Sequence, residues 1–252
     1  MSSNSTGTST KSPVTLFIPC LVDQVYPEIG LAMVKILRHF DYKLVYDPRQ
    51  TCCGQPAFNA GHRNEARQVA EQFIDIFQQA ETIVAPSGSC VAMVRNYYPV
   101  LFQDHPREKS AINVSKRVFE FSEFLARENL IPGISGTFTG RVGFHNSCHS
   151  YRELGVKTEP LEILKRISGY DLVELPGEPV CCGFGGLFSF KFDYVAAAMA
   201  VNRVDMFRSR NVDTIVSNDP GCIMHMRQEI KAEKIDLQLL HLTEFLVQSM
   251  RL

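Results

Sequence analysis

The chain has 252 residues, 45% of them hydrophobic, so it can bury a sizeable core, which excludes disorder over its whole length. Its 26 basic and 27 acidic residues give a formal net charge of -1, which provides no bulk field to attract nucleic acid or an anionic membrane. No apolar run approaches the roughly 20 residues that cross a bilayer, and residues 1–13 lack the apolar stretch of a secretory signal. We therefore expect a cytoplasmic protein with a disordered tail at residues 1–13.

The eight cysteines fall into two sets with the same order: a single cysteine, an adjacent pair, and another single cysteine. The separations agree closely, with 31 and 36 residues between the members of the first set and 32 and 39 between those of the second. A chain of this size without an export signal is expected in a reducing compartment, where thiolate chemistry or metal binding is favoured over disulfides. The sets are Cys20, Cys52, Cys53 and Cys90, and Cys148, Cys181, Cys182 and Cys222.

The residues around the cysteines repeat too, which indicates an internal duplication. Each leading cysteine ends an apolar segment, TLFIPC or VGFHNSC, and each pair is followed by glycine, in TCCG or VCCG. Each last cysteine ends a similar segment, ETIVAPSGSC or DTIVSNDPGC, and FEFSEFL matches LHLTEFL further on. We therefore predict a first module at residues 14–126, a linker with Pro and Gly at 127–140, and a second module at 141–252.

The hydrophobic pattern predicts the order β-α-β-α-β in each module. Strands alternating with helices indicate an α/β fold of two tandem repeated modules, each a small, mostly parallel sheet flanked by helices. Ser122 and Thr243, each followed by Glu-Phe-Leu, indicate the N-caps of two further short helices. The predicted elements are 14–19, 27–40, 42–46, 61–79 and 82–85 in the first module, and 141–145, 160–168, 170–175, 194–210 and 214–217 in the second.

Every cysteine follows a predicted strand. In parallel sheets ligands bind beyond the carboxyl ends of the strands, so the four cysteines of a module can converge there although they are far apart in sequence. Adjacent cysteines have Cα atoms only about 3.8 Å apart and diverging side chains, so a strain-free disulfide within a pair is not expected. Gly54 and Gly183 permit a positive φ and, we expect, a close approach of an inorganic core to the backbone.

Four thiolates suit either zinc or an iron–sulfur cluster. Structural zinc sites usually draw their ligands from two tight C-x2–4-C knuckles, whereas here three separate loops contribute, which favours the iron–sulfur interpretation. Buried cysteines that serve only as small hydrophobic residues are disfavoured, because packing does not require a repeated Cys-Cys-Gly. We predict that all eight cysteines are metal ligands and hold the cofactor.

Other residues near the cysteines are weaker candidates. His145 and His149 flank Cys148, and His225 follows Cys222 by three residues, so a mixed site is conceivable. The first module has no matching histidines, so we expect these to hydrogen-bond or lie on the surface rather than ligate. The Gly183–Gly186 segment lacks the context of a phosphate-binding loop, and the phenylalanine-rich segment 187–192 is expected in the core or in a subunit contact.

The patterns Cys20-x31-Cys52-Cys53-Gly54-x35-Cys90 and Cys148-x32-Cys181-Cys182-Gly183-x38-Cys222 resemble the cysteine-rich CCG domain. That domain occurs in heterodisulfide reductase, in the iron–sulfur subunits of glycolate oxidase and anaerobic glycerol-3-phosphate dehydrogenase, and in lactate utilization protein A. A short chain of two such modules, with no ferredoxin-type C-x2-C-x2-C-x3-C run, looks most like the lactate utilization protein A family. The resemblance covers nearly all of the chain beyond the tail.

The resemblance implies a redox subunit of an oxidoreductase complex, which transfers electrons while L-lactate is oxidised to pyruvate. It leaves open whether this chain is itself an enzyme. The implied partners are subunits similar to lactate utilization proteins B and C, and the implied cofactors are up to two iron–sulfur clusters of the 4Fe-4S type, with the type left open. In the heterodisulfide reductase form each copy ends in C-x2-C, but here Ser87 and Asp219 occupy the first of those positions. A non-cubane cluster therefore does not follow from the resemblance, and an oxygen ligand at these positions stays open.

Two further hypotheses compete with electron transfer. The heterodisulfide reductase relative suggests an enzyme of thiol–disulfide chemistry, although the loss of the fifth cysteine weighs against it. A zinc-stabilised assembly protein without catalytic activity is the third. No Arg/His pair stands out in the sequence as a clamp for a 2-hydroxy acid.

Overall fold

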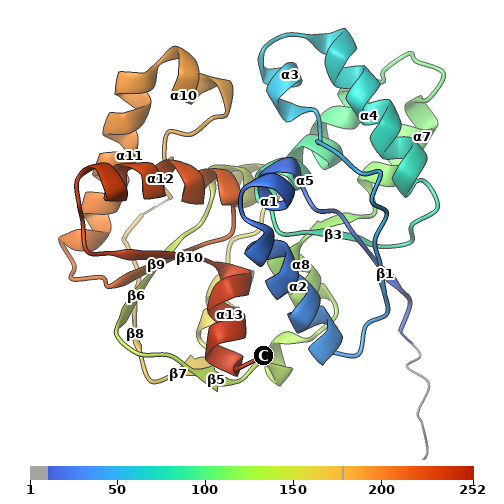
Figure 1. The fold of residues 1–252 in the computed structure, drawn as a ribbon. Helices are drawn as coiled ribbons and strands as arrows, with labels where there is room; N and C mark the ends of the chain where they lie inside the picture. Colours follow the sequence, from blue (N-terminus) through green and yellow to red (C-terminus); the bar gives the residue numbers. More distant parts are fainter. Residues whose placement is uncertain (1–10, 178) are drawn as a thin grey trace, which may run out of the picture.

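The computed structural model describes residues 11–177 and 179–252, so most of the predicted tail lies outside the described residues. Figure 1 shows two lobes, each built on one sheet, with the helices α2 (Pro27–His39), α8 (Phe121–Arg127) and α13 (Leu242–Met250) between them. Among the described residues, no helix combines the length and the apolar character needed to cross a bilayer.

The remaining elements follow the chain from one lobe to the other. The first lobe contains β1 (Val14–Leu16), α1 (Cys20–Gln24), β2 (Leu44–Val45), α3 (Gln55–Asn59), α4 (Arg63–Phe77), β3 (Ile83–Ala85), α5 (Gly88–Ala92), η1 (Met93–Tyr97), α6 (Tyr98–Leu101), α7 (Glu108–Ser115) and β4 (Val118–Glu120). The connection and second lobe contain η2 (Ile131–Gly133), β5 (Gly136–Thr137), β6 (Arg141–His145), η3 (His149–Glu153), α9 (Glu159–Leu164), β7 (Ile167–Ser168), β8 (Asp171–Val173), α10 (Leu187–Lys191), α11 (Asp193–Arg208), β9 (Thr214–Ser217), α12 (Pro220–Ala232) and β10 (Gln238–His241).

The two sheets have the same topology. The strand order is β2-β1-β3-β4 in the first and β8-β6-β9-β10 in the second, and every pairing is parallel. The leading strand of each module therefore lies between the second and the third, and helices connect the successive parallel strands. This arrangement confirms the predicted α/β class with two tandem parallel modules.

Each sheet contains a fourth strand, β4 or β10, that the sequence pattern did not predict. Both lie at the start of the repeated FEFSEFL and LHLTEFL segments, just before the residues predicted to cap two short helices. Part of the predicted linker is also a strand, because Gly136 and Thr137 pair with Ile167 and Ser168. The helix predicted at 160–168 consequently ends at Leu164, since the backbone beyond it is extended and joins this small second sheet.

The N-caps of α8 and α13 are Glu120 and His241, two residues before the predicted Ser122 and Thr243. The Glu120 carboxylate accepts hydrogen bonds from the backbone N–H groups of Ser122 and Glu123, and His241 accepts one from Thr243 N–H at 3.1 Å. A glutamate three residues after each cap completes a capping box. The Thr243 hydroxyl serves instead to tie the modules together, because it donates to the Ile29 carbonyl of α2 at 3.1 Å.

The modules share one hydrophobic core. The helices α2, α8, α9 and α13 lie with their apolar faces in it, together with inward residues of both sheets. Burial of this kind contributes roughly 25 cal/mol per Å² of apolar surface, so the shared core stabilises the pair of modules as one body. Its buried members from the two sheets include Val14, Leu16, Val84, Val142, Val216 and Leu240.

The buried Glu120 gives the fold a specific dependence on pH. Burial raises the pKa of Glu120 to about 7, in spite of its hydrogen bonds with Ser122 and Glu123, from the ordinary value of 4.5. Because the folded state holds the proton more tightly than the unfolded state, this carboxyl contributes stability below pH 4.5 that is lost as the pH rises through 7.

We predict that Glu120→Gln, which stays neutral, becomes progressively more stable relative to the wild type between pH 4.5 and 7. The difference in the free energy of unfolding should grow by about 3 kcal/mol over that range. Urea denaturation at fixed pH values measures it, with the exposed Glu81→Gln as the control for the loss of one carboxyl. A difference between Glu120→Gln and wild type that stays constant with pH would contradict the assignment.

Candidate metal centres

Three loops of the first module converge because of the strand order. Cys20 starts α1, the first helix after β1, Cys52 and Cys53 lie between β2 and α3, and Cys90 lies in α5 after β3. Since β1 lies between β2 and β3, the loops that follow these three strands meet at one edge of the sheet. The second module repeats this arrangement after β6, β8 and β9.

The four thiols of the first module lie within reach of one another. The Cys20 and Cys52 sulfurs are 3.8 Å apart, and the Cys53 thiol lies in hydrogen-bonding contact with both Cys52 and Cys90. The backbone N–H of Gly54 donates to the Cys52 sulfur at 3.3 Å. The Cys53 side chain is buried, whereas the other three are partly accessible.

The second module brings its own four thiols together. The sulfurs of Cys148 and Cys181 are 4.0 Å apart, and those of Cys182 and Cys222 are 3.1 Å apart. The Gly183 N–H donates to the Cys181 sulfur at 3.3 Å, which repeats the contact of Gly54. Every cysteine singled out in the sequence thus lies in one of two four-thiol clusters. Ligation by these thiols stays a prediction.

The thiols of each cluster differ in how readily they ionise. Donation from Cys20 and then from Cys53 lowers the pKa of Cys52 to about 3, and donation from Cys148 and Cys182 lowers the pKa of Cys181 to about 2. The hydrogen bond to Cys52, followed by burial, raises the pKa of Cys20. Each cluster therefore holds one thiolate readily. The raised pKa values of Cys20, Cys53, Cys148 and Cys182 mean that a nearby cation would favour their ionisation. This donor set fits a metal ion or an iron–sulfur cluster, whose positive charge would offset four thiolates.

The glycines of the two Cys-Cys-Gly triplets lie close to the backbone of a helix. Gly54 and Gly183 have φ values of +83° and +89°, as the sequence predicted. A Cβ at Gly183 would lie 2.6 Å from the Ala196 carbonyl oxygen of α11, and one at Gly54 would lie 3.2 Å from the Ala66 carbonyl oxygen of α4. The close approach of a helix backbone therefore requires glycine at both positions, and the approach of an inorganic core there stays a prediction.

Ser87 and Asp219, where a fifth cysteine would stand, have other roles. Ser87 caps α5, and the Asp219 carboxylate caps α12 through a 3.0 Å hydrogen bond from Gly221 N–H. The second oxygen of Asp219 crosses to the first module, where it accepts from Ser89 N–H at 2.8 Å. Both carboxylate oxygens thus hold backbone groups in place, which disfavours Asp219 as a cluster ligand.

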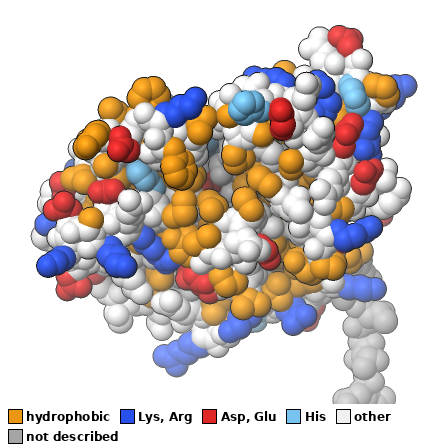
Figure 2. Space-filling view, turned by 45° about the horizontal axis from the view of Figure 1, so that its top comes forward, with side chains coloured by type: hydrophobic (Ala, Val, Ile, Leu, Met, Phe, Trp, Pro, Cys, Tyr) orange, Lys and Arg blue, Asp and Glu red, His pale blue; other side chains and the backbone are white. Residues whose placement is uncertain are grey.

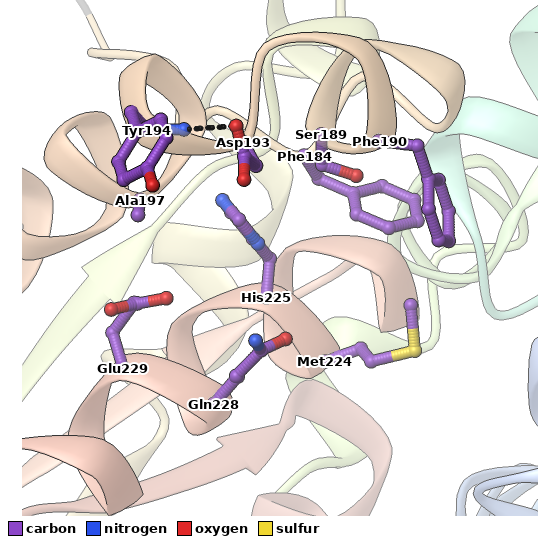
Figure 3. Close-up of a pocket in the computed structure, with 10 residues that line it drawn as sticks. All are labelled: Phe184, Ser189, Phe190, Asp193, Tyr194, Ala197, Met224, His225, Gln228 and Glu229. Carbon is purple, nitrogen blue, oxygen red and sulfur yellow. Dashed lines mark hydrogen bonds between the residues drawn. The ribbon is translucent and has the colours of Figure 1, made fainter.

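Two of the three histidines also have structural partners. His225 donates from Nε2 to the Ala196 carbonyl at 3.0 Å and so joins α12 to α11, beside a cavity of about 410 Å³ (Figure 3). Among the described residues that line this cavity, none is a cysteine. His149 places Nδ1 3.7 Å from the Cys148 sulfur and Nε2 3.3 Å from the side-chain nitrogen of Gln55 in the first module.

His145 and Arg203 form a buried pair that the sequence reasoning missed. Arg203 donates from Nε to His145 Nδ1 at 2.9 Å, and neither side chain is more than 3% exposed. A ring nitrogen of His145 lies within 4.8 Å of the sulfurs of Cys182 and Cys222. Burial, followed by the charge of Arg203, lowers the pKa of His145 to about 3, so the imidazole is neutral. The sequence signal that could have revealed this pair was an arginine, Arg203, at a core-facing position of α11.

The first cluster lies at a mostly apolar cavity of about 310 Å³ between the lobes. All four thiols of the first module line it, and Phe184, Leu187 and Phe190 of the second module form its other wall. Figure 2 shows hydrophobic side chains gathered around the hollow between the lobes. Phe190 is 80% exposed, so part of the segment 187–192 lies at the surface rather than in the core.

Two parallel α/β modules, each gathering four thiols at the carboxyl edge of its sheet, define a duplicated cysteine-rich protein. The family model of the cysteine-rich domain (CCG) matches residues 14–95 and 142–227. Lactate utilization protein A from Oceanobacillus iheyensis is 37% identical over 233 residues, covering 92% of this chain and 96% of the relative. Lactate utilization protein A 2 from Bacillus cereus strain Q1 is 35% identical over 238 residues, covering 94% of this chain and 98% of the relative.

The chain therefore belongs to the cysteine-rich CCG domain family, in the group formed with the lactate utilization protein A relatives. Among solved structures, glutamate racemase from Francisella tularensis gives a TM-score of 0.38 at 16% identity, covering 94% of this chain and 80% of that chain. That likeness is too distant to bear on the site.

We predict that Gly88→Ala destabilises the protein by about 1–3 kcal/mol, because an added Cβ would lie 1.8 Å from the Ser150 hydroxyl across the contact between the modules. Ser150→Ala removes that oxygen, so the double variant should recover part of the loss. Urea denaturation of wild type, both single variants and the double variant measures the coupling. Strictly additive effects of the two substitutions would show that the modules do not meet at this point.

Proposed function

We propose that each four-thiol cluster binds one iron–sulfur cluster, and that the chain transfers electrons in a lactate utilization system that oxidises L-lactate to pyruvate. The names of the relatives support the system, and the two thiol sets support the cofactor. The division into modules at 14–126 and 141–252, joined through 127–140, is part of this proposal, with one centre in each.

The observation that carries the proposal is the convergence of four sulfurs from three loops at the edge of each sheet. Adjacent cysteines within each pair face different neighbours: Cys182 contacts Cys222, while Cys181 contacts Cys148. Adjacent cysteines that point in two directions can bind different metal atoms of one polynuclear centre. A single zinc ion is usually bound instead by two C-x2–4-C segments.

The bound cluster would supply one-electron chemistry, and the chain would hold, shield and tune it. Cys52 and Cys181 are the thiols most ready to ligate, because each already accepts a backbone N–H and neighbouring thiol donors. The burial of Cys53 and Cys182 limits the access of water. We place the meeting point with partner subunits, similar to lactate utilization proteins B and C, at the apolar cavity beside the first cluster.

An alternative is an enzyme of thiol–disulfide chemistry. The 3.1 Å separation of the Cys182 and Cys222 sulfurs favours it, because two thiols so close could exchange with a substrate disulfide. A zinc-stabilised assembly protein is a further alternative. Metal and sulfide analysis separates all three functions.

We predict that anaerobically purified protein contains iron and acid-labile sulfide, and shows an EPR signal after reduction. Cys53→Ser and Cys182→Ser should each lower the iron content to about half, and the double variant should retain almost none, because each change breaks one four-thiol set. Ser89→Ala, next to Cys90, is the matched control and should keep the wild-type content. A colourless protein with zinc and no sulfide would exclude the iron–sulfur proposal.

We predict that L-lactate reduces the iron–sulfur chromophore of this chain when the partner subunits are present. The absorbance lost should match that lost with dithionite, because both reduce the same centres. D-lactate in the same mixture is the control. Clusters that dithionite reduces, but that L-lactate and the complete set of partners leave oxidised, would argue against a role in L-lactate oxidation.

A further inference from the structure

The two modules differ in chemical character at two places beside their thiols: at Ser87 and Asp219, described above, and at a pair of buried positions that touch each other. The inward residues of α4 and α11 correspond one to one, each numbered 130 higher in the second module: Ala66, Ala70, Phe73, Ile74 and Phe77 match Ala196, Ala200, Arg203, Val204 and Phe207. The only change of chemical character in this series is Phe73 to Arg203. Three residues before the leading cysteine, Phe17 of the first module corresponds to His145 of the second.

The two changes occur together because the positions touch. In the first module the rings of Phe17 and Phe73 pack edge to face with centroids 4.9 Å apart. In the second module the same contact is a hydrogen bond, from Arg203 Nε to His145 Nδ1 at 2.9 Å. An apolar pair behind one thiol cluster is thus replaced by a cationic, hydrogen-bonding pair behind the other.

The direction of that hydrogen bond fixes the state of the imidazole. A guanidinium can only donate, so His145 Nδ1 accepts and the ring proton is on Nε2. His145 Nε2 is fully buried and has no hydrogen-bond partner among the residues that the structure describes. A buried N–H without an acceptor is costly, and one of the two ring nitrogens lies within 4.8 Å of the sulfurs of Cys182 and Cys222. The N–H on Nε2 is therefore an unpaired donor on a ring that lies beside the sulfurs of this centre.

Arg203 also lacks a counter-charge. Over residues 11–177 and 179–252, no carboxylate forms an ion pair with it, and its guanidinium contacts His145, the Met206 sulfur and the Phe207 ring. A buried cation is costly unless an anion offsets its charge. The nearby groups able to do so are Cys182 and Cys222 once a bound centre holds them as thiolates, because their charges would act on Arg203.

We propose that Arg203 and His145 stabilise added negative charge at the second centre, so that this centre has a higher reduction potential than the first. The inference rests on the proposed binding of one iron–sulfur cluster by each thiol set. Reduction adds one electron from a reduced redox partner or dithionite, and the centre becomes one charge more negative with no bond broken. A nearby cation and an N–H donor favour the reduced form, whereas Phe17 and Phe73 favour neither form. The first electron taken up by the chain then resides at the second centre.

The order of the two potentials can be measured with the Arg203–His145 pair intact. Cys53→Ser leaves only the second centre and Cys182→Ser leaves only the first, so an EPR-monitored redox titration of each variant gives one midpoint. We expect the higher midpoint in Cys53→Ser. Equal midpoints, or the reverse order, would overturn the inference while leaving cluster binding intact. A wild-type protein without iron and sulfide would instead overturn the proposed function and this inference with it.

The contribution of Arg203 can be tested in the Cys53→Ser background. Arg203→Met should lower the midpoint so that the reduction equilibrium constant falls at least tenfold, which is about 59 mV for a one-electron couple. His145→Phe should lower the midpoint too. Arg203→Lys, which keeps the charge, should lower the midpoint much less than Arg203→Met does. Arg227→Met, at an arginine of α12 that binds the Leu239 carbonyl, is the matched control and should leave the midpoint unchanged. An unchanged midpoint in Arg203→Met with the cluster bound would refute the assignment.

Discussion

The position of the leading strand at the centre of a parallel sheet determines the rest of this structure. Because β1 and β6 each lie between the second and third strands of their sheets, the three cysteine-bearing loops of each module lie side by side at one edge of its sheet. The strand order thus brings thiols that are far apart in sequence close together, which is how open parallel sheets generally build their sites.

The cysteine-bearing edges of the two sheets resemble each other, and they also contact each other. Asp219 caps a helix of the second module and holds Ser89 of the first, and His149 lies between the Cys148 sulfur and Gln55. Duplication has therefore produced two centres with one scaffold but different surroundings. The first faces an apolar hollow, and the second has a buried arginine and imidazole behind it. Similar geometry and dissimilar electrostatics are what the proposed electron transfer with two unequal centres requires.

The sequence predicted the features that depend on local pattern and repetition. The segments 141–145 and 214–217 are strands with the predicted bounds, and the helices predicted at 27–40 and 61–79 differ from the observed ones by two residues at most. Tertiary pairing decided what was missed. The short strands at 118–120 and 136–137 exist because a neighbouring strand accepts their hydrogen bonds, which no local pattern reveals. Arg203 escaped notice because a charged side chain on a helix is normally assigned to solvent.

The common core between the lobes bears on how such a chain can arise. An unfused module would leave the apolar faces of its own copies of α2 and α8 uncovered, since in the present chain α9 and α13 of the other half complete that core. A single module of this kind would need a second copy of itself to cover those faces. A symmetric dimer of such copies must carry any substitution twice, whereas the joined chain carries its buried histidine and arginine on one side only.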